Sequence, residues 1–167
     1  MARDPKSGDP RFDDDAVARL RRSITRLTRL LNEAASDEGL SPTQASVLAI
    51  AAWRGPLGLA ELAEIEGLNA TMLSRIVGKL DAEGLLRRTP NPADQRAAFV
   101  EGTARGREVS LRIRARRTET VTKILSGLSP EVATTLLAAL PALEALADAG
   151  VRPRGPGQRN PAPTSEG

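Results

Sequence analysis

The sequence predicts a mainly α-helical protein that carries a small two-stranded β-hairpin. Alanine and leucine dominate its hydrophobic residues, and aromatic residues make up only 2% of the chain. Apolar residues recur three and four positions apart through most of the central region. One proline-rich stretch, "RRTPNPADQR" at 87–96, interrupts that spacing between two short apolar runs. Because alanine and leucine favour helices whereas proline breaks them and promotes turns, these observations predict helices around one hairpin.

The residue types that are missing exclude several kinds of chemistry. The 167-residue chain contains no cysteine, histidine or tyrosine. It therefore has no disulfide, thiolate nucleophile, Ser-His-Asp triad or usual zinc site, and we expect neither an enzyme nor a bound metal or cofactor. No apolar run approaches the roughly 20 residues of a transmembrane helix, and the N-terminus lacks the apolar core of a signal peptide. We therefore expect a cytoplasmic protein without a membrane partner.

The formal net charge is only +3, but arginines gather in two segments. Such clusters have two interpretations: a solvated helix face, or a surface that meets the phosphates of a nucleic acid. Composition alone leaves both open. The first segment carries Arg19, Arg21, Arg22, Arg26 and Arg29, and the second carries Arg107, Arg112, Arg114, Arg116 and Arg117.

The first predicted helix covers residues 13–36, between a polar N-terminus and the body of the chain. Residues 1–12 and 149–167 are rich in proline, glycine and polar residues, so we expect both to be disordered. Within the helix, apolar residues follow a heptad pattern that is typical of a seam between helices. This seam could pack inside the monomer, but the scarcity of bulky residues elsewhere favours a partner chain. Its members are Val17, Leu20, Ile24, Leu27 and Leu31.

The other helices are predicted from their start and stop signals. Ser41, Pro42 and Gln44 combine an N-cap, a proline at the first helical position and a capping box. Thr103 can cap the helix that follows the hairpin, and Pro141 should kink or interrupt the last one. The predicted ranges are 41–53, 59–65, 69–83 and 103–126, and a last helix starts at Ser129.

The stretch from Leu59 to Leu86 has the pattern of a helix-turn-helix. Two helices flank Gly67, which supplies the backbone freedom of a tight turn, and Ala63 is small enough for the helices to approach closely. The second helix carries an apolar stripe at Leu73, Ile76, Val77 and Leu80, which leaves Ala70, Thr71, Ser74, Arg75 and Lys79 on its opposite face. That face fits a reader of the DNA major groove, but an ordinary α-helical hairpin explains this segment equally well.

The basic hairpin decides between these two interpretations. A helix-turn-helix followed at once by a basic two-stranded hairpin is the layout of a winged helix, whose wing contacts the DNA backbone or the adjacent minor groove. Residues 69–100 contain five cations against three acids. The sequence therefore predicts a winged helix-turn-helix with a small two-stranded β wing. The cations of the wing are Arg87, Arg88 and Arg96.

The region from residue 40 to about 106 resembles the MarR family of dimeric winged-helix transcription regulators. The matching pieces are "LSPTQASVL" at 40–48, "LAELAEIEGLNATMLSRIVGKLDAEGLLRR" at 59–88 and "DQRAAFVEGTARG" at 94–106. The flanking helices extend the likeness to residues 13–148. The resemblance implies a winged-helix DNA-binding lobe at 41–102 and a helical dimerisation region at 13–36 and 103–148. In the last helices, the dimerisation residues would be Leu136, Leu140 and Leu143.

The resemblance further implies a homodimer that binds a pseudo-palindromic operator in double-stranded DNA. Asn69, Ala70, Thr71 and Arg75 would contact base edges, and Ser74, Arg75, Lys79, Arg87 and Arg88 would contact phosphates. By the same resemblance, Arg96 would enter the minor groove and Asp94 would orient it, although a salt bridge inside the wing also explains this pair. The family's usual behaviour implies a repressor released by a small, often aromatic, molecule, for which Trp53 and an arginine would suit. The alternative is a winged-helix protein-interaction scaffold without DNA binding.

Three residues depart from the family pattern. Gly102 replaces a leucine at the base of the wing, which suggests a loosened base. Glu66 occupies a position before the turn that is usually apolar. Gly78 lies in the middle of the second helix of the helix-turn-helix, at a cost of up to about 1 kcal/mol relative to alanine.

Overall fold

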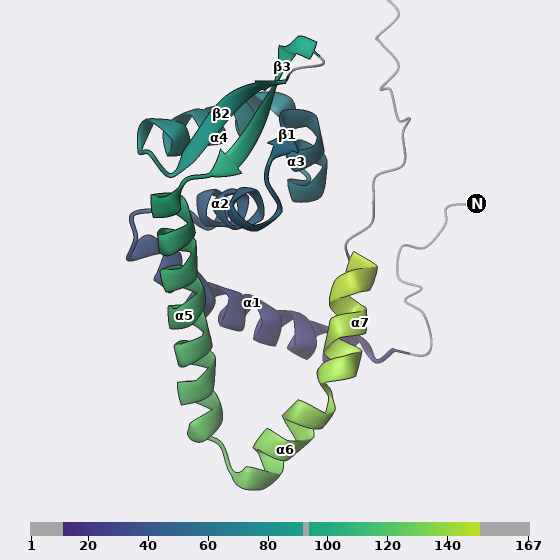
Figure 1. Ribbon diagram of the computed structural model, residues 1–167. Helices are drawn as coiled ribbons and strands as arrows, with labels where there is room; N and C mark the ends of the chain where they lie inside the picture. Colours follow the sequence, from purple (N-terminus) through teal and green to yellow (C-terminus); the bar gives the residue numbers. More distant parts are fainter. Residues whose placement is uncertain (1–11, 92–93, 151–167) are drawn as a thin grey trace, which may run out of the picture.

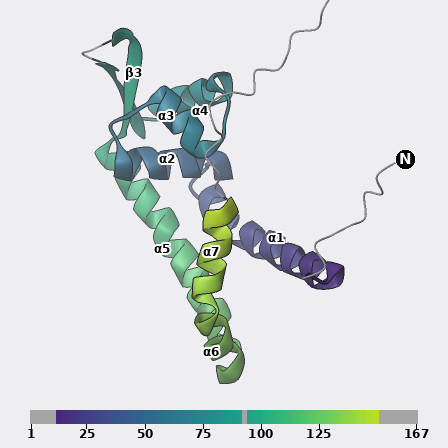
Figure 2. The ribbon, with the colours of Figure 1, turned by 90° about the vertical axis from the view of Figure 1, so that its right-hand side faces the viewer.

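The computed structural model describes residues 12–91 and 94–150 and has two parts (Figure 1). A compact lobe contains three helices and a small sheet. Four further helices lie outside it: α1 crosses below the lobe, α5 runs away from it, α6 lies at the far end of α5, and α7 turns back (Figure 1). Figure 2 shows the same separation from the side. The mainly helical prediction is confirmed.

The three helices of the lobe begin close to the predicted positions, and the first begins at its predicted cap. In α2 (Pro42–Arg54), the Ser41 amide donates to Gln44 Oε1 at 2.8 Å and the Gln44 amide donates to Ser41 Oγ at 3.2 Å, which confirms the capping box. Between α3 (Leu59–Glu66) and α4 (Ala70–Ala82), Gly67 takes a left-handed φ of 65°. Because glycine has no Cβ, this conformation carries no steric penalty there, and the predicted helix-turn-helix is confirmed.

The sheet has three strands, whereas the sequence predicted two. Strands β2 (Leu86–Asn91) and β3 (Asp94–Gly102) form the predicted antiparallel hairpin, with Arg88 opposite Val100. A third strand, β1 (Leu57–Gly58), pairs with the other edge of β3, so the order is β1-β3-β2. Two residues are too few to show the alternation that identifies a strand in sequence. The extra strand binds the base of the wing to the segment between α2 and α3.

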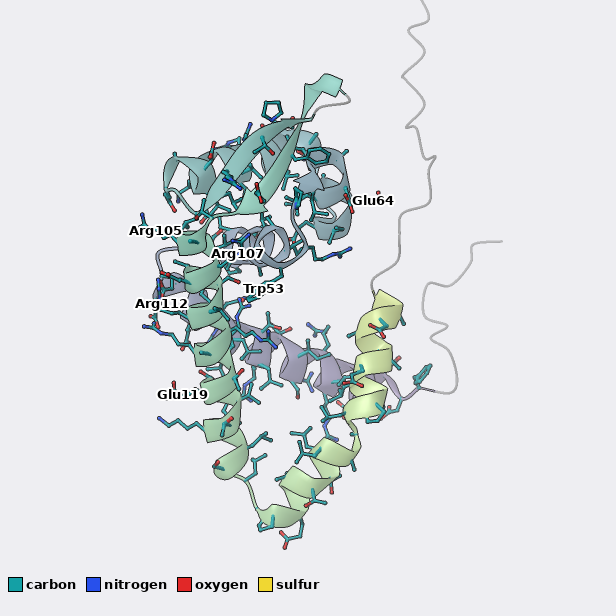
Figure 3. All side chains as sticks on the ribbon, viewed as in Figure 1. Trp53, Glu64, Arg105, Arg107, Arg112 and Glu119 are labelled. Atoms are coloured by element: carbon teal, nitrogen blue, oxygen red, sulfur yellow. The ribbon has the colours of Figure 1, made fainter. Side chains whose placement is uncertain are left out.

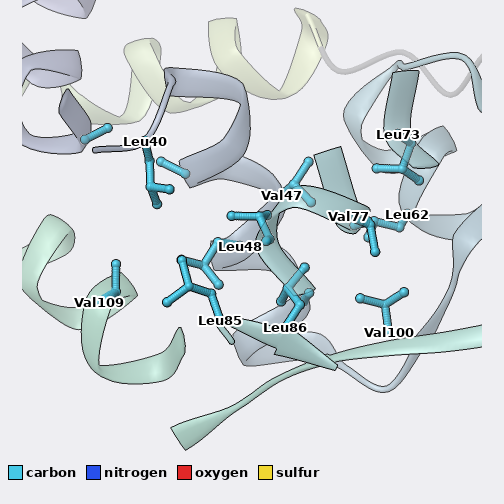
Figure 4. Packing of buried hydrophobic residues seen from close by; sticks show 14 of the residues in the cluster. Leu40, Val47, Leu48, Leu62, Leu73, Val77, Leu85, Leu86, Val100 and Val109 are labelled. Atoms are coloured by element: carbon cyan, nitrogen blue, oxygen red, sulfur yellow. The ribbon is translucent and has the colours of Figure 1, made fainter. Parts of the chain in front are cut away.

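The hydrophobic core draws on every element of the lobe and extends to the adjoining ends of α1 and α5 (Figure 4). Its largest fully buried side chains come from α2, α3, α4 and β2, because each helix turns one apolar stripe inward. Each such side chain contributes roughly 1.5–3 kcal/mol by leaving water. They are Leu48, Leu62, Leu73, Leu80 and Leu86.

Helix α5 (Ala104–Ser126) is anchored to the lobe by close packing at two glycines, one in its first turn and one at the end of β3. A Cβ on Gly106 would collide with the carbonyl oxygen of Leu85. A Cβ on Gly102 would lie 2.6 Å from the Cα of Ala52 in α2. The buried Gly102 therefore packs the end of β3 tightly against α2, and the loosened wing base suggested by the sequence is not observed.

Near its C-terminal end, helix α1 (Asp14–Ser36) contributes the buried Ala34 and Ala35 to the same apolar cluster as two residues of α5. Three arginines of α5 add polar contacts to the end of α1 and to the residues that follow it. Arg112 makes two hydrogen bonds to Glu38, at 3.0 and 2.8 Å, and Arg116 pairs with Asp37 at 2.7 Å. Arg117 donates to the carbonyl oxygen of Leu31 at 3.2 Å. The hydrogen bond from Arg112 lowers the pKa of Glu38 below its ordinary value, although burial opposes the shift. These arginines of the second cluster therefore hold helices together.

The last two helices are α6 (Pro130–Ala138) and α7 (Leu140–Gly150), which meet at a bend of 44°. The bend confirms the interruption predicted from Pro141, because proline lacks the amide that a continuous helix would need. No residue of α6 is buried. In the described part of the chain no single helix is long and apolar enough to cross a membrane, and α6 with α7 would pass that test only as a bent pair.

Candidate functional site

Helix α4 presents a polar face on the outside of the lobe. Its buried stripe is formed by Leu73, Val77 and Leu80, while the half-buried Ile76 flanks it. The burial of this stripe places the five residues of the predicted reading face in solvent. They are Ala70, Thr71, Ser74, Arg75 and Lys79, and all five are exposed.

Asn69 has a structural role that the sequence analysis did not assign to it. It is the N-cap of α4, and its Oδ1 accepts a hydrogen bond of 2.8 Å from the Met72 amide. Removing such a cap costs about 1 kcal/mol. The oxygen of Asn69 is therefore engaged inside the protein, and only its amide NH₂ group is left for the base contact that we predicted.

Sequence analysis missed Met72, whose side chain is 45% exposed in the first turns of α4. Its helical position could have identified it, because it lies outside the apolar stripe. At this end of a helix that the sequence predicts to enter the major groove, an exposed methionine can contact the methyl group of thymine.

The predicted cations differ in how their side chains are engaged. Arg87 Nε donates to Glu101 Oε1 across the hairpin at 2.7 Å, and Lys79 lies 3.9 Å from Glu83. Arg88 Nη2 donates to the backbone oxygen of Ser74 in α4 at 3.1 Å. Arg75 has no ion pair or side-chain hydrogen bond to another described residue. Arg75 is therefore the cation of α4 most available to a ligand.

The tip of the wing cannot be compared with the prediction. Residues 92–93 lie outside the described residues, and so do the side chains of Asp94 and Arg96. The backbone of both residues belongs to β3, two positions apart, which places them on one face of the strand.

Glu66, the second departure from the family pattern, has a partner in α2. Ser46 Oγ donates to Glu66 Oε1 at 2.6 Å, which joins α2 to the end of α3. The hydrogen bond compensates for placing a half-buried carboxylate where an apolar residue is usual. Across residues 12–91 and 94–150, no three histidine, cysteine, aspartate or glutamate side chains gather as a metal site would require.

A separate cavity of about 280 Å³ lies between α2 and α5. Trp53 is 54% exposed there, and its indole N–H donates to Ser110 Oγ at 3.3 Å (Figure 3). Two arginines of α5, Arg114 and Arg117, also line the cavity. It thus combines an aromatic surface with cationic groups, but it lies away from the reading face of α4.

Comparisons with known proteins agree with this architecture. The family model named MarR matches residues 40–98, which run from the start of α2 into β3. The chain is 28% identical over 95 residues to the HTH-type transcriptional regulator YkoM of Bacillus subtilis. That match covers 57% of this chain and 62% of YkoM, so it spans less than two thirds of that relative.

Two experimentally determined structures show the same fold over most of the chain. The transcriptional regulator Tm0710 of Thermotoga maritima is 29% identical with a TM-score of 0.65, covering 83% of this chain and 97% of Tm0710. MepR of S. aureus, in its F27L mutant bound to an oligodeoxyribonucleotide, is 17% identical with a TM-score of 0.60. That likeness covers 78% of this chain and 97% of MepR and concerns the fold alone. Residues 40–98 therefore match the MarR family, and the fold around them is shared with the transcriptional regulator Tm0710.

Proposed function

We propose that this protein is a homodimeric regulator that binds a specific, pseudo-palindromic site in double-stranded DNA. The observation that carries the proposal is the exposed face of α4, which joins Thr71, Ser74 and Arg75 next to a basic wing. The DNA-bound structure of the similarly folded MepR supports this choice of partner. Contacts to phosphates and contacts to base edges have different consequences: the first supply salt-sensitive affinity, and the second supply specificity.

Within α4, the position of each exposed side chain and its contacts in the protein indicate which part of the DNA it binds. Thr71 and Arg75 lie at the centre of the exposed face and are the readers of base edges, together with Ala70 and the amide nitrogen of Asn69. Lys79 lies a turn further along, where it approaches a phosphate. Arg87 keeps guanidinium donors that its bond to Glu101 does not use, and these serve the same purpose. Asp94 and Arg96 extend the contact to the minor groove.

The homodimer is supported by apolar side chains that the monomer leaves in water. On α1, Val17, Leu20, Ile24 and Leu27 are 44–50% exposed, and only Leu31 is partly covered. Monomeric proteins rarely expose an apolar stripe of this length, so a second copy of the chain covers it. The matching residues of α6 and α7, Leu136, Leu140 and Leu143, are 38–44% exposed.

Light scattering at several protein concentrations tests the dimer. Leu20→Asp places a carboxylate in the seam, and we expect it to yield monomers or a much weaker dimer. Arg26→Asp introduces the same group on the opposite face of α1 and should leave the mass of a dimer unchanged. A wild-type protein that is monomeric at all concentrations would contradict the proposal.

Selection of bound duplexes from a random DNA pool tests the DNA-binding function. Wild type should enrich a two-fold symmetric site whose half-sites lie roughly 10 base pairs apart. Arg75→Ala should weaken binding to that site about tenfold or more, because a base contact contributes about 1–3 kcal/mol. Arg26→Ala removes the same charge from α1 and serves as the control. Failure to enrich any sequence would favour the protein-interaction scaffold.

The regulatory part of the proposal is repression that a small aromatic acid relieves. The cavity between α2 and α5 supports it, because the Trp53 indole can stack on an aromatic ring and Arg114 or Arg117 can pair with its carboxylate. Because α5 begins directly after the wing, a ligand in this cavity can change the position of the lobe relative to α5.

Calorimetry with benzoate, followed by DNA titration in its presence, tests this part. Binding with a loss of operator affinity is expected for the wild type, and Arg117→Gln should weaken both. Binding of benzoate that leaves operator affinity unchanged would refute ligand release at this cavity.

A further inference from the structure

Arg88 makes a contact that its expected role as a phosphate ligand does not require. It stands on β2, and its Nη2 donates at 3.1 Å to the backbone oxygen of Ser74 on α4. In a continuous helix this oxygen already accepts the amide of the residue four positions later, which is Gly78. Arg88 is thus a second donor to a carbonyl in the middle of the helix that carries the reading face.

Gly78 explains why the guanidinium can reach this carbonyl. A side chain four residues after a helical carbonyl stands beside it on the same face of the helix. A Cβ built on Gly78 would lie 3.6 Å from Arg88 Nη2, which is an ordinary van der Waals contact. Alanine therefore fits without moving the arginine. Any longer side chain would extend into the space next to the guanidinium.

We propose that Arg88 is a positioning residue that fastens the wing to the recognition helix through the Ser74 carbonyl, and that Gly78 leaves the room for it. This inference rests on the proposed DNA-binding function and refines it. A wing and a helix that enter neighbouring grooves must keep a set angle, because a misplaced contact weakens both. The hydrogen bond from Arg88 to the Ser74 carbonyl forms a joint between the wing and α4, and this joint fixes the angle. Gly78, which lowers the helix propensity of α4, therefore leaves the space that this joint needs.

The choice of arginine suits this position. Its guanidinium carries five donors in one plane, so one N–H can bind the Ser74 carbonyl while others remain in solvent. The side chain of Arg88 is exposed. A positioning role and a phosphate contact therefore make different predictions about specificity, and they can be separated experimentally.

The test compares the wild type with three single variants and one double variant in binding to the selected operator and to a random duplex, each at several salt concentrations. Gly78→Leu blocks the joint but keeps the charge of Arg88, and Arg88→Ala removes the donor. Gly78→Ala is the matched control, because alanine and leucine both favour helices and only leucine reaches the guanidinium. We expect Gly78→Leu and Arg88→Ala to lower the ratio of operator to random affinity about tenfold, the loss expected for one charge-assisted hydrogen bond.

The double variant should lose no more of this ratio than either single variant, because both changes remove one joint. The inference is overturned if Gly78→Leu discriminates like the wild type. It is also overturned if Arg88→Ala weakens operator and random duplex equally and reduces the salt slope by about 1 per subunit, as a phosphate contact would. If Gly78→Leu does not fold, the ratio measured for Arg88→Ala decides.

A measurement without DNA separates this inference from the proposed function. Amide hydrogen exchange in β2 and α4 should be faster in Arg88→Ala and Gly78→Leu than in the wild type and Gly78→Ala. Unchanged exchange in both variants refutes the joint even if the wild type binds its operator. If the wild type binds no duplex at all, the proposed function fails, and exchange still shows whether the joint exists.

Discussion

The hydroxyl of Thr103 joins the end of the wing to α5, and its removal gives a quantitative prediction. Its Oγ1 donates to the carbonyl oxygen of Gly84 at 2.7 Å and accepts a hydrogen bond of 3.0 Å from the Gly106 amide. The first bond holds the turn that follows α4, and the second caps α5. Thr103→Val keeps the size and branching of the side chain but loses both bonds.

The magnitude follows from the two bonds. Loss of an N-cap costs about 1 kcal/mol, and the net value of the second hydrogen bond is about 1 kcal/mol. The free energy of unfolding should therefore fall by about 2 kcal/mol in Thr103→Val. For a chain of this length that corresponds to a decrease of about 4–8 °C in Tm.

Urea denaturation at one fixed protein concentration provides the assay, since a dimer's stability depends on concentration. Thr103→Ser retains the hydroxyl and should lose much less stability than Thr103→Val. A valine variant within about 0.5 kcal/mol of the wild type would refute the reasoning, because that is the range of an ordinary surface substitution. A serine variant as unstable as the valine variant would show that the methyl group matters and the hydroxyl does not.

Three further predictions concern the core, the cap of α4 and the junction with α1. Leu48→Ala should lower the free energy of unfolding by about 2–5 kcal/mol in urea denaturation, because Leu48 is fully buried and a cavity would remain. Asn69→Asp should keep the stability of the wild type, since a carboxylate also caps a helix, but should weaken operator binding in a titration by repelling phosphates. Wild-type stability should fall as the pH drops from about 4.3 through the lowered folded-state pKa of Glu38, because its ion pair with Arg112 is present only above that range. In Glu38→Gln this part of the acid dependence, measured by urea midpoints across pH, should disappear; an unchanged acid profile would argue against the pair.

The local structure of this chain could be predicted because its signals lie within a few residues of each other. Ser41 with Gln44 and the turn at Gly67 each determine a backbone conformation through atoms four or fewer residues apart. Pro141 acts in the same way, because the amide it lacks belongs to its own helix. The two-residue strand β1 was not predicted, because its partners, Phe99 and Val100, are some forty residues away.

The candidate site shows the same difference between local features, which could be predicted, and contacts between distant segments, which could not. Helical spacing placed Thr71, Ser74 and Arg75 on one exposed face, since the period of a helix and the burial of its apolar stripe suffice for that. The partners of the wing arginines could not be predicted in the same way. Arg87 and Arg88 are neighbours with one charge, yet the first binds Glu101 across the hairpin and the second binds α4. The pleat of β2 sends adjacent side chains to opposite faces, and only packing determines what each face meets.

The sequence by itself therefore determined the helices, their caps, the helix-turn-helix and the hairpin that follows it, because these depend on local sterics and on periodicity. The tertiary structure alone decided that Gly102 tightens the base of the wing, that Glu66 binds Ser46 and that Arg88 reaches the carbonyl of Ser74 beside Gly78. Each of these depends on two segments brought into contact by burial of the common core. A residue that is unfavourable within its own segment can be suited to the partner that folding brings to it.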